Sequence, residues 1–296
     1  MTTGIIIGII VLIGFLIALF LGTPVCVSMI LSGVIGSMLL LREPFAAFTF
    51  LTSEFLSTFT SYSLCVAPMF ILMGEIASES KIGTNLFSSL QIIVGRVRGG
   101  LANATQIGCA VFGALCGSGG ATAALMCRVA YPEMKKYNYS DLLSTGCIAS
   151  SASLATLIPP SVFLITYGIA AEESIGKLFA GGIFCGIVLT ILLIITSQIW
   201  GLINPSIAPA GVKTTMKEKL KAIRDGHFIE IFLVFALSMG GMFAGWFTPT
   251  EGGAVGVACM VLLSIYLKRF NLKVLLKAAE NTLVMCGMMY ALLASA

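Results

Sequence analysis

Charged residues are scarce in this sequence. Only 10% of its 296 residues are Asp, Glu, Lys or Arg, and histidine occurs once. Soluble globular domains carry about 25% charged residues, so the composition excludes a soluble domain. The net charge of +4 is modest. The basic residues lie in short loops instead of on one face, which argues against nucleic acid as a partner.

Cysteine pairs with metal-binding or redox spacing are absent as well. None of the nine cysteines forms a CxxC pair, and all of them fall in apolar segments. We therefore interpret them as small buried hydrophobic residues and expect neither a disulfide nor a metal site built from them. The first 21 residues lack the basic region of a signal peptide, so we interpret that segment as a retained membrane span.

A base for serine catalysis is also missing. The one histidine, His227, stands beside a basic loop at the start of an apolar segment. A nucleophilic serine such as Ser118 needs a base within hydrogen-bond reach, and we find no second His, Lys or Asp at membrane depth. We therefore expect no enzyme. An intramembrane hydrolase is the weaker alternative, and labelling of Ser118 by a fluorophosphonate probe would favour it.

Long apolar segments dominate what the sequence does contain. Hydrophobic residues make up 58% of it, and its mean hydropathy is +1.03, which predicts an all-α polytopic membrane protein. The apolar segments cover residues 4–21, 24–41, 64–80, 99–127, 140–168, 175–200, 228–246, 250–267 and 278–296. Two amphipathic pieces, 44–61 and 82–94, are expected either to lie along the membrane interface or to be ordinary connecting helices.

Two of the apolar segments are broken in the middle. In Leu101–Val129, glycines crowd around Ser118, so each half keeps only about a dozen residues against the ~20 that a spanning helix needs. We therefore predict a re-entrant hairpin over residues 99–127. In the segment 140–168, SSAS at 150–153 is followed by Ile158-Pro159-Pro160-Ser161. Proline removes a helix hydrogen bond and clashes with the preceding turn, which predicts a broken helix.

These breaks are the candidate binding site. Lipid cannot satisfy free N–H and C=O groups, so irregular backbone is tolerated only where it is buried or lines a wet cavity. Half-helices that end near Cys116 or Leu157 present carbonyls suited to a small cation, and those that begin near Ser118 or Ser161 present N–H groups suited to a carboxylate. The candidate residues are Gly117, Ser118, Gly119 and Thr122 in the hairpin, and Ser150, Ser151, Ser153, Thr156, Pro159 and Ser161 in the broken helix.

Two alternatives stay open for these residues. Small residues also form tight helix-packing motifs in membranes. Hydroxyl groups inside membrane helices often bond only to the preceding turn.

The distribution of lysine and arginine predicts the orientation. With 99–127 taken as re-entrant, all but two of the 17 basic residues, Arg42 and Lys177, lie on the side of the 201–227 loop. The positive-inside rule makes that side cytoplasmic and places the N-terminus outside. Counting the hairpin as a true span would move Lys81, Arg96 and Arg98 outside, so the charges favour the re-entrant interpretation.

A short sequence pattern that occurs twice predicts an inverted repeat. Gly22-Thr23-Pro24 and Phe247-Thr248-Pro249 each link two apolar segments, and the orientation places the two links on opposite sides. A complete second repeat would need roughly 425 to 450 residues, so we expect the sequence to be incomplete. We expect scaffold spans and an interfacial helix over 1–62, a transport core over 63–200, a cytoplasmic linker over 201–227 and the start of the second repeat over 228–296.

Three polar features have structural interpretations. Thr248 and Glu251 have the spacing of a helix capping box, which we favour over a proton-carrying role for Glu251. Glu75 is interpreted as solvated near the cytoplasmic end of its span. The basic piece 213–224 places Met216, Leu220 and Ile223 on one face, which predicts a helix on the cytoplasmic membrane surface.

Four stretches carry a family resemblance. They read APMFILMGE at 67–75, FGALCGSGGATAA at 112–124, LIPPSVFLITYGIAAEESIGKLFAGGIFCGI at 157–187 and FTPTEGGAVG at 247–256. With them the sequence resembles the large membrane subunit of tripartite ATP-independent periplasmic (TRAP) transporters, the DctM-like family. The family's hairpin tip usually reads close to GSSxA, whereas Ser118 is followed here by Gly119-Gly120-Ala121. The resemblance therefore implies one hydroxyl ligand fewer at this tip.

The resemblance implies an elevator-type carrier in the bacterial inner membrane, driven by a sodium gradient, with sodium as the coupling ion and no other cofactor. Its sodium ligands would come from Cys116, Gly117, Ser118 and Thr156. It implies two partners, a small membrane subunit of about four helices and a periplasmic binding protein that delivers an organic acid such as a C4-dicarboxylate or a sialic acid. A channel with a re-entrant loop, or an inactive fragment of the carrier, are the alternatives.

Overall fold

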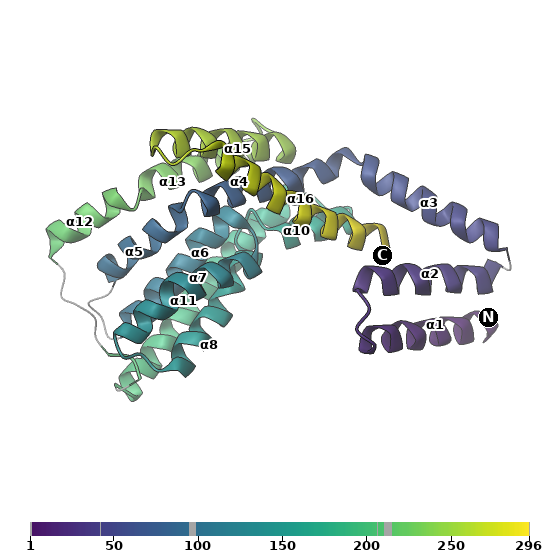
Figure 1. The fold of residues 1–296 in the computed structure, drawn as a ribbon, viewed down its shortest axis with the longest axis horizontal. Helices are drawn as coiled ribbons and strands as arrows, with labels where there is room; N and C mark the ends of the chain where they lie inside the picture. Colours follow the sequence, from purple (N-terminus) through teal and green to yellow (C-terminus); the bar gives the residue numbers. More distant parts are fainter. Residues whose placement is uncertain (1, 42, 95–98, 206, 210–214, 296) are drawn as a thin grey trace. The chain divides into compact units, whose positions relative to one another are not determined.

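A computed structural model describes residues 2–41, 43–94, 99–205, 207–209 and 215–295 of the chain. Within these ranges every regular element is a helix (Figure 1). The all-α prediction is therefore confirmed for the described part of the chain. Arg42, Arg96, Arg98 and Lys213, which entered the orientation argument, lie outside the described residues.

The chain forms two compact units. The first comprises Met1–Cys65 with Leu283–Ala296, and the second comprises Val66–Thr282. In the first unit, helix α2 (Val25–Leu41) packs against α1 (Thr2–Phe20) and α3 (Pro44–Thr60). A short 3-10 helix, η1 (Tyr62–Cys65), follows, and the Tyr290 hydroxyl donates to the Leu64 carbonyl at 2.8 Å.

The second unit holds the remaining elements. They are α4 (Val66–Glu79), α5 (Ile82–Val94), α6 (Gly100–Cys116), α7 (Gly119–Lys136), α8 (Asp141–Ala152), α9 (Leu154–Leu157), α10 (Val162–Ala170), α11 (Ile175–Ile203), α12 (Met216–Asp225), α13 (Phe228–Phe235), the π-helix η2 (Ala236–Gly240), α14 (Gly241–Phe243), α15 (Pro249–Tyr266) and the first part of α16 (Leu272–Ser295).

Helix α6 is the centre of the second unit. It packs against α4, α5, α7, α8, α9 and α11 (Figure 1). Nearly all of its residues are buried. Most of its residues are small or apolar, as expected for a helix in such a central place. Two of its polar side chains are bonded to α11: Ser197 Oγ donates to Asn103 Oδ1 at 3.0 Å, and Gln106 Nε2 donates to the Leu193 carbonyl at 3.1 Å. These bonds satisfy groups whose burial would otherwise destabilise the unit.

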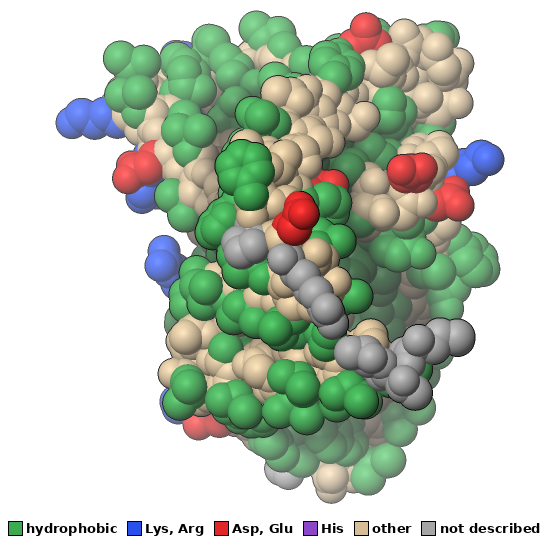
Figure 2. Space-filling model, turned by 90° about the vertical axis from the view of Figure 1, so that its right-hand side faces the viewer, with side chains coloured by type: hydrophobic (Ala, Val, Ile, Leu, Met, Phe, Trp, Pro, Cys, Tyr) green, Lys and Arg blue, Asp and Glu red, His purple; other side chains and the backbone are tan. Residues whose placement is uncertain are grey.

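Several described helices have the length and apolar character of membrane spans. Tyr62–Glu79, Ile175–Ile203 and Pro249–Tyr266 qualify alone, and two bent helix pairs raise the number from three to five if each is counted as one span. Helix α11 exposes Ile187, Ile191 and Ile195 at a spacing of four, so one stripe of it is apolar and uncovered. Hydrophobic side chains are also spread over the whole face drawn in Figure 2, and charged ones are fewer. Such surfaces suit lipid contact.

The helices differ from the sequence-based expectations in three places. The second arm of the hairpin continues past residue 127 to Lys136, because Met134 and Tyr139 join a buried cluster with Leu101 and Leu143. The hydropathy of the sequence shows where a helix stops being apolar but does not show where the helix ends. The segment 228–246 is interrupted by the π-helix η2. The cysteines at 65, 127 and 185 are exposed in this chain, so the expectation that all nine are buried was wrong.

Candidate functional site

The first break separates α6 from α7 at Gly117 and Ser118. Gly117 has a left-handed backbone (φ 61°), and its N–H donates to the Gly113 carbonyl at 2.7 Å, which closes α6 at Cys116. Ser118 is extended and caps α7, with its hydroxyl oxygen accepting from the Ala121 N–H at 3.4 Å. Glycine followed by serine therefore supplies both a helix stop and a helix start within two residues.

The second break separates α9 from α10 at residues 158–161. Ile158 is extended after the end of α9, and Pro159 and Pro160 follow it. Ser161 caps α10 by accepting from the Leu164 N–H at 3.3 Å, and its hydroxyl donates to the Thr156 carbonyl at 2.6 Å. The helical segments on the two sides of this break are bent by 45°.

The two breaks touch each other. The Val162 N–H donates to the Gly117 carbonyl at 3.2 Å. A Cβ atom added to Gly117 would collide with the Pro160 carbonyl oxygen, and one added to Gly119 would lie 3.2 Å from the Ala152 carbonyl oxygen and 3.3 Å from Thr156 Cγ2. The hairpin turn thus lies directly on the non-helical backbone of the second break, and two interrupted helices end and begin in one place.

Neighbouring helices approach this junction through further glycines. At four of these glycines an added Cβ atom would collide with a neighbouring residue. The colliding pairs are Gly74 and Cys116, Gly113 and Ala155, Gly182 and the Leu157 carbonyl, and Gly186 and the Ile158 side chain. Close packing of small residues therefore explains Gly113 and Gly117, as the packing alternative expected. It does not explain Gly120, which has open space where its Cβ would be.

The predicted hydroxyl groups divide into two sets. Thr156 and Ser161 lie at the junction, together with the prolines. Ser150 and Ser153 are exposed and donate to carbonyls of their own helix turn, at 2.8 Å to Gly146 and 2.6 Å to Ser150 respectively. Thr156 also bonds backward, to the Ser153 carbonyl at 2.7 Å. Ser151 is buried 3.9 Å from Cys147 Sγ.

Thr122 stabilises the hairpin turn from inside. Its hydroxyl is fully buried, donates to the Ser118 carbonyl at 2.9 Å and lies 3.1 Å from Cys116 Sγ. Thr122 and Cys116 are thus engaged with the turn itself, whereas Ser118 is partly exposed. Thr156 is partly exposed as well, so Ser118 and Thr156 are the predicted hydroxyl residues of the junction that are not buried.

An apolar hollow adjoins the junction at Ile158. It has a volume of about 400 Å³ and is lined by Ala110, Val111, Ala114, Leu115, Ile158, Phe228, Ile231, Phe232 and Phe235. Because every lining side chain is apolar, this hollow offers no side-chain partner for a carboxylate or a cation.

Glu75 was misinterpreted from the sequence. Its side chain is only 7% exposed, and Asn281 Nδ2 of α16 donates to Glu75 Oε2 at 2.8 Å. It is therefore buried and bonded, not solvated at the interface. One helical turn away, Lys277 of α16 pairs with Glu79 at 3.3 Å. The matching spacing of four in the two helices was the signal that could have revealed this contact. Because Gly74 packs on Cys116, Glu75 lies next to the hairpin turn.

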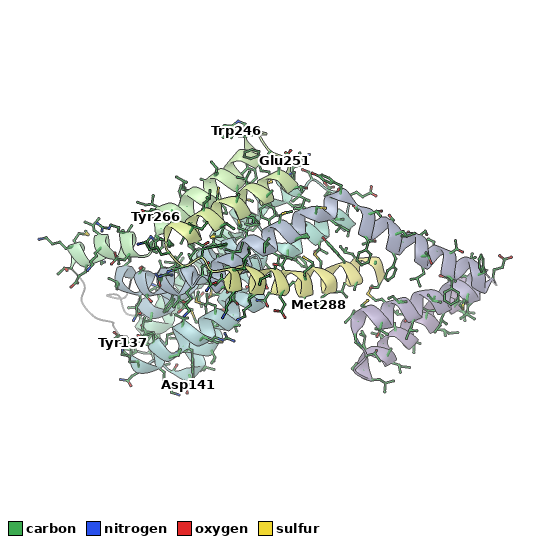
Figure 3. The ribbon with its side chains drawn as sticks, turned by 45° about the horizontal axis from the view of Figure 1, so that its top comes forward. Tyr137, Asp141, Trp246, Glu251, Tyr266 and Met288 are labelled. Atoms are coloured by element: carbon green, nitrogen blue, oxygen red, sulfur yellow. The ribbon has the colours of Figure 1, made fainter. Side chains whose placement is uncertain are left out.

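Thr248 and Glu251 form a capping box at the start of α15. The Thr248 N–H donates to Glu251 Oε2 at 2.8 Å, and the Glu251 N–H donates to the Thr248 hydroxyl at 3.4 Å. Figure 3 shows Glu251 near Trp246 at one end of α15, with Tyr266 at the other end.

This capping box leads to a testable prediction. Replacing Thr248 with alanine is expected to lower the free energy of unfolding by about 1 kcal/mol, because one N–H at the helix start loses its partner. Thermal unfolding of the purified protein measures the effect. Thr250→Ala, two residues further on, is the control and should change stability less. Equal effects of the two variants would show that the cap contributes nothing.

Comparison with known proteins finds related transport proteins. A family model described as "Tripartite ATP-independent periplasmic transporter, DctM component" matches residues 12–296. The ectoine TRAP transporter large permease protein TeaC of Halomonas elongata is 31% identical over 93% of this chain and 64% of its own length. The C4-dicarboxylate TRAP transporter large permease protein DctM of Pseudomonas aeruginosa is 31% identical over 79% of this chain and 55% of its own.

A third relative carries another substrate name. The sialic acid TRAP transporter large permease protein SiaM of Vibrio cholerae is 28% identical over 82% of this chain and 55% of its own length. The chain thus matches between 55% and 64% of the length of these three relatives.

Proposed function

Because this chain belongs to the DctM component family of tripartite ATP-independent periplasmic transporters, we propose that it forms the large permease subunit of a sodium-driven importer of an organic acid. One observation carries the proposal: the hairpin turn at Gly117 and Ser118 rests on the second break, with the Val162 N–H bonded to the Gly117 carbonyl. Two sets of helix ends at one place offer both signs of partial charge to a solute.

The substrate is proposed to carry a carboxylate. Ectoine, C4-dicarboxylates and sialic acid, the substrates in the names of the relatives, all contain this group. Helices α7 and α10 begin at the junction, where their positive dipole ends favour an anion. The Val162 N–H at the start of α10 is already bonded to the Gly117 carbonyl, so the other N–H groups of these first turns are the proposed donors. The serine caps Ser118 and Ser161 lie beside these N–H groups.

Sodium is proposed to bind at the helix ends of the same junction. Helices α6 and α9 end at Cys116 and Leu157, and terminal carbonyl oxygens suit a hard monovalent cation. Cys116 and Gly117 lie at the end of α6, and Ser118 and Thr156 carry hydroxyl groups within two residues of the two helix ends. The Thr156 hydroxyl already donates to the Ser153 carbonyl. The backbone carbonyl of Thr156 is therefore the better candidate ligand, and it also accepts a hydrogen bond from the Ser161 hydroxyl.

The transport cycle is proposed to be of the elevator type. In it, residues 63–200 would move as a transport core against scaffold spans in 1–62, and 228–296 would begin an inverted second repeat after the linker 201–227. The hairpin would re-enter the membrane, and the N-terminus would face the periplasm. A small membrane subunit and a periplasmic binding protein would complete the assembly in the inner membrane. A channel is the alternative, and counterflow decides between them, because only a carrier accelerates exchange when it is loaded on the far side.

Ser118 provides the test of the site. Replacing it with alanine in the native gene product, reconstituted with its partner subunits, is expected to raise the sodium concentration for half-maximal uptake about five- to tenfold, as for the loss of one polar contact worth ~1 to 1.5 kcal/mol. Uptake of labelled substrate at varied sodium concentration measures this shift.

Ser140→Ala is the matched control for this test. Ser140 is the N-cap residue of α8, as Ser118 is of α7, and its hydroxyl oxygen accepts from the Leu143 N–H at 3.2 Å. Both variants lose a helix cap, so both should lose a similar ~1 kcal/mol of stability. Only Ser118→Ala should change the sodium dependence. An unchanged sodium dependence in Ser118→Ala would remove Ser118 from the site.

A further inference from the structure

A polar hollow lies away from the junction, between two loops of the second unit. Its volume is about 530 Å³. One wall is the loop from α4 to α5, and the other is the loop from α15 to α16. The lining residues are Glu79, Ser80, Lys81, Thr84, Asn85, Lys268, Arg269, Phe270, Asn271 and Val274. Three of these are cations and one is a carboxylate, so the hollow has an excess of positive charge.

The two helices that lead into the hollow run in the same direction. Gly253 of α15 packs on Met69 of α4, and Gly256 packs on Met73, so residue numbers rise together along both helices. Both helices belong to candidate membrane spans, Tyr62–Glu79 and Pro249–Tyr266. Two parallel spans end at one membrane surface, which places the hollow at the level of the lipid head groups.

The two loops share one backbone feature, a lysine in the left-handed conformation. Lys81 and Lys268 are both left-handed, with φ of 57° and 55°, and each lies within two residues of the end of its span. Arg269 Nη1 joins the loops by donating to the Ser80 carbonyl at 3.3 Å and to the Lys81 carbonyl at 3.1 Å. Arg269 therefore holds the hollow together.

The lysine charges are not neutralised within the described structure. The one lining carboxylate, Glu79, is paired with Lys277 at 3.3 Å. Among the described residues, neither Lys81 nor Lys268 has an acidic oxygen within 4.0 Å, and both side chains are exposed. Two free ammonium groups thus face a hollow that also contains the Thr84 hydroxyl and the Asn85 amide.

We propose that this hollow binds the phosphate of an anionic phospholipid head group, with Lys81 and Lys268 as its cationic ligands. Basic pockets between membrane helices on the cytoplasmic side are suited to such head groups. Apolar side chains beside the hollow suit the acyl chains: Leu272 and Leu276 at the start of α16 are 63% and 61% exposed, and Tyr266 is 73% exposed. An aromatic residue of this kind is favoured at the membrane interface. The proposal does not depend on which substrate is transported.

The test measures lipid binding, not transport. The native gene product is purified in detergent, and binding of phosphatidylglycerol and of phosphatidylcholine is measured by native mass spectrometry and by the shift of the thermal midpoint. Phosphatidylglycerol should bind and stabilise, and phosphatidylcholine should not. The double variant K81Q/K268Q should bind phosphatidylglycerol roughly 30-fold more weakly, because each basic residue near an anionic lipid contributes ~1 kcal/mol.

The double variant K135Q/K136Q is the matched control. It removes the same number of lysine charges from the exposed end of α7, outside the hollow, where Lys135 pairs with Asp141 at 3.1 Å and Lys136 with Glu133 at 3.8 Å. It should change binding by less than about threefold, because exposed charges far from the bound head group are largely screened. Equal loss in both double variants, or no loss in K81Q/K268Q, would overturn the proposal. Complete displacement of phosphatidylglycerol by inorganic phosphate would overturn the lipid assignment, whereas retention of the lipid supports it.

Discussion

Replacing Gly117 with alanine is expected to abolish transport and to lower the free energy of unfolding by about 3 kcal/mol or more. A left-handed backbone costs an L-residue roughly 1 to 2 kcal/mol, and Gly117 has φ of 61°. The added Cβ would also collide with the Pro160 carbonyl oxygen. The position of the Cβ is fixed by the Gly117 backbone, and the Pro160 oxygen is itself a backbone atom, so neither can move away without a shift of the backbone.

Relief of this collision would separate the two breaks. The Val162 N–H would then lose the Gly117 carbonyl, which leaves a polar group of the junction without its partner. Thermal unfolding and uptake assays measure the two consequences separately. We expect uptake to fall even at temperatures where the variant stays folded, because the helix ends no longer meet.

Gly120→Ala is the matched control for Gly117→Ala. It lies on the same hairpin, three residues away, with open space where the Cβ would be. Alanine inside a helix is more favourable than glycine by up to ~1 kcal/mol, so this variant should be neutral or slightly stabilised and should retain uptake. If Gly117→Ala and Gly120→Ala behaved alike, the contact between the two breaks would have no functional importance.

Replacing Asn281 with leucine is the second change with a large expected effect. Asn281 donates to the Glu75 carboxylate at 2.8 Å, and the described residues hold no cationic nitrogen within 4.0 Å of that carboxylate. Leucine would leave the buried carboxylate without this donor. Hydrogen bonds to charged groups contribute about 1.5 to 3 kcal/mol, and an unsatisfied buried partner adds to the loss. We therefore expect a loss of about 3 kcal/mol in the free energy of unfolding.

The neighbouring pair on the same two helices provides the control. Lys277→Leu removes the partner of Glu79 in the same way, but the Lys277 side chain is 62% exposed. Exposed ion pairs contribute about 0 to 1 kcal/mol, so this variant should be close to the native protein. Glu75→Gln combined with Asn281→Leu should recover part of the lost stability, since no charge then stays buried. A small effect of Asn281→Leu alone would show that water replaces the amide.

The sequence predicted the interruptions of the helices well. Gly117-Ser118 and Pro159-Pro160-Ser161 act through local rules, since glycine permits a left-handed turn, proline removes a helix hydrogen bond and serine caps the next helix. The capping box of Thr248 and Glu251 is local for the same reason, because its two side chains are three residues apart. Hydropathy was less exact about where helices end, as the continuation of α7 to Lys136 shows.

The sequence did not predict which groups these interruptions face. Glu75 and Asn281 are 206 residues apart in the sequence. From the sequence alone, a carboxylate at the end of an apolar segment is as consistent with a solvated side chain as with a buried one. Ser150 and Ser153 looked like members of the site, but their hydroxyls bond within their own helix. Whether a serine bonds backward or faces a neighbour depends on which side of its helix is covered.

The amino-acid sequence by itself therefore determined the membrane class of the chain, the positions of its two broken helices and the caps that start the helices beyond them. These properties depend on composition and on residues within one or two turns of each other. Only the tertiary structure decided that Gly117 meets Pro160, that Val162 bonds to the hairpin and that Asn281 reaches Glu75. The reason is physical: each of these contacts joins separate helices, and their packing arises from the fit of many side chains at once rather than from any local pattern.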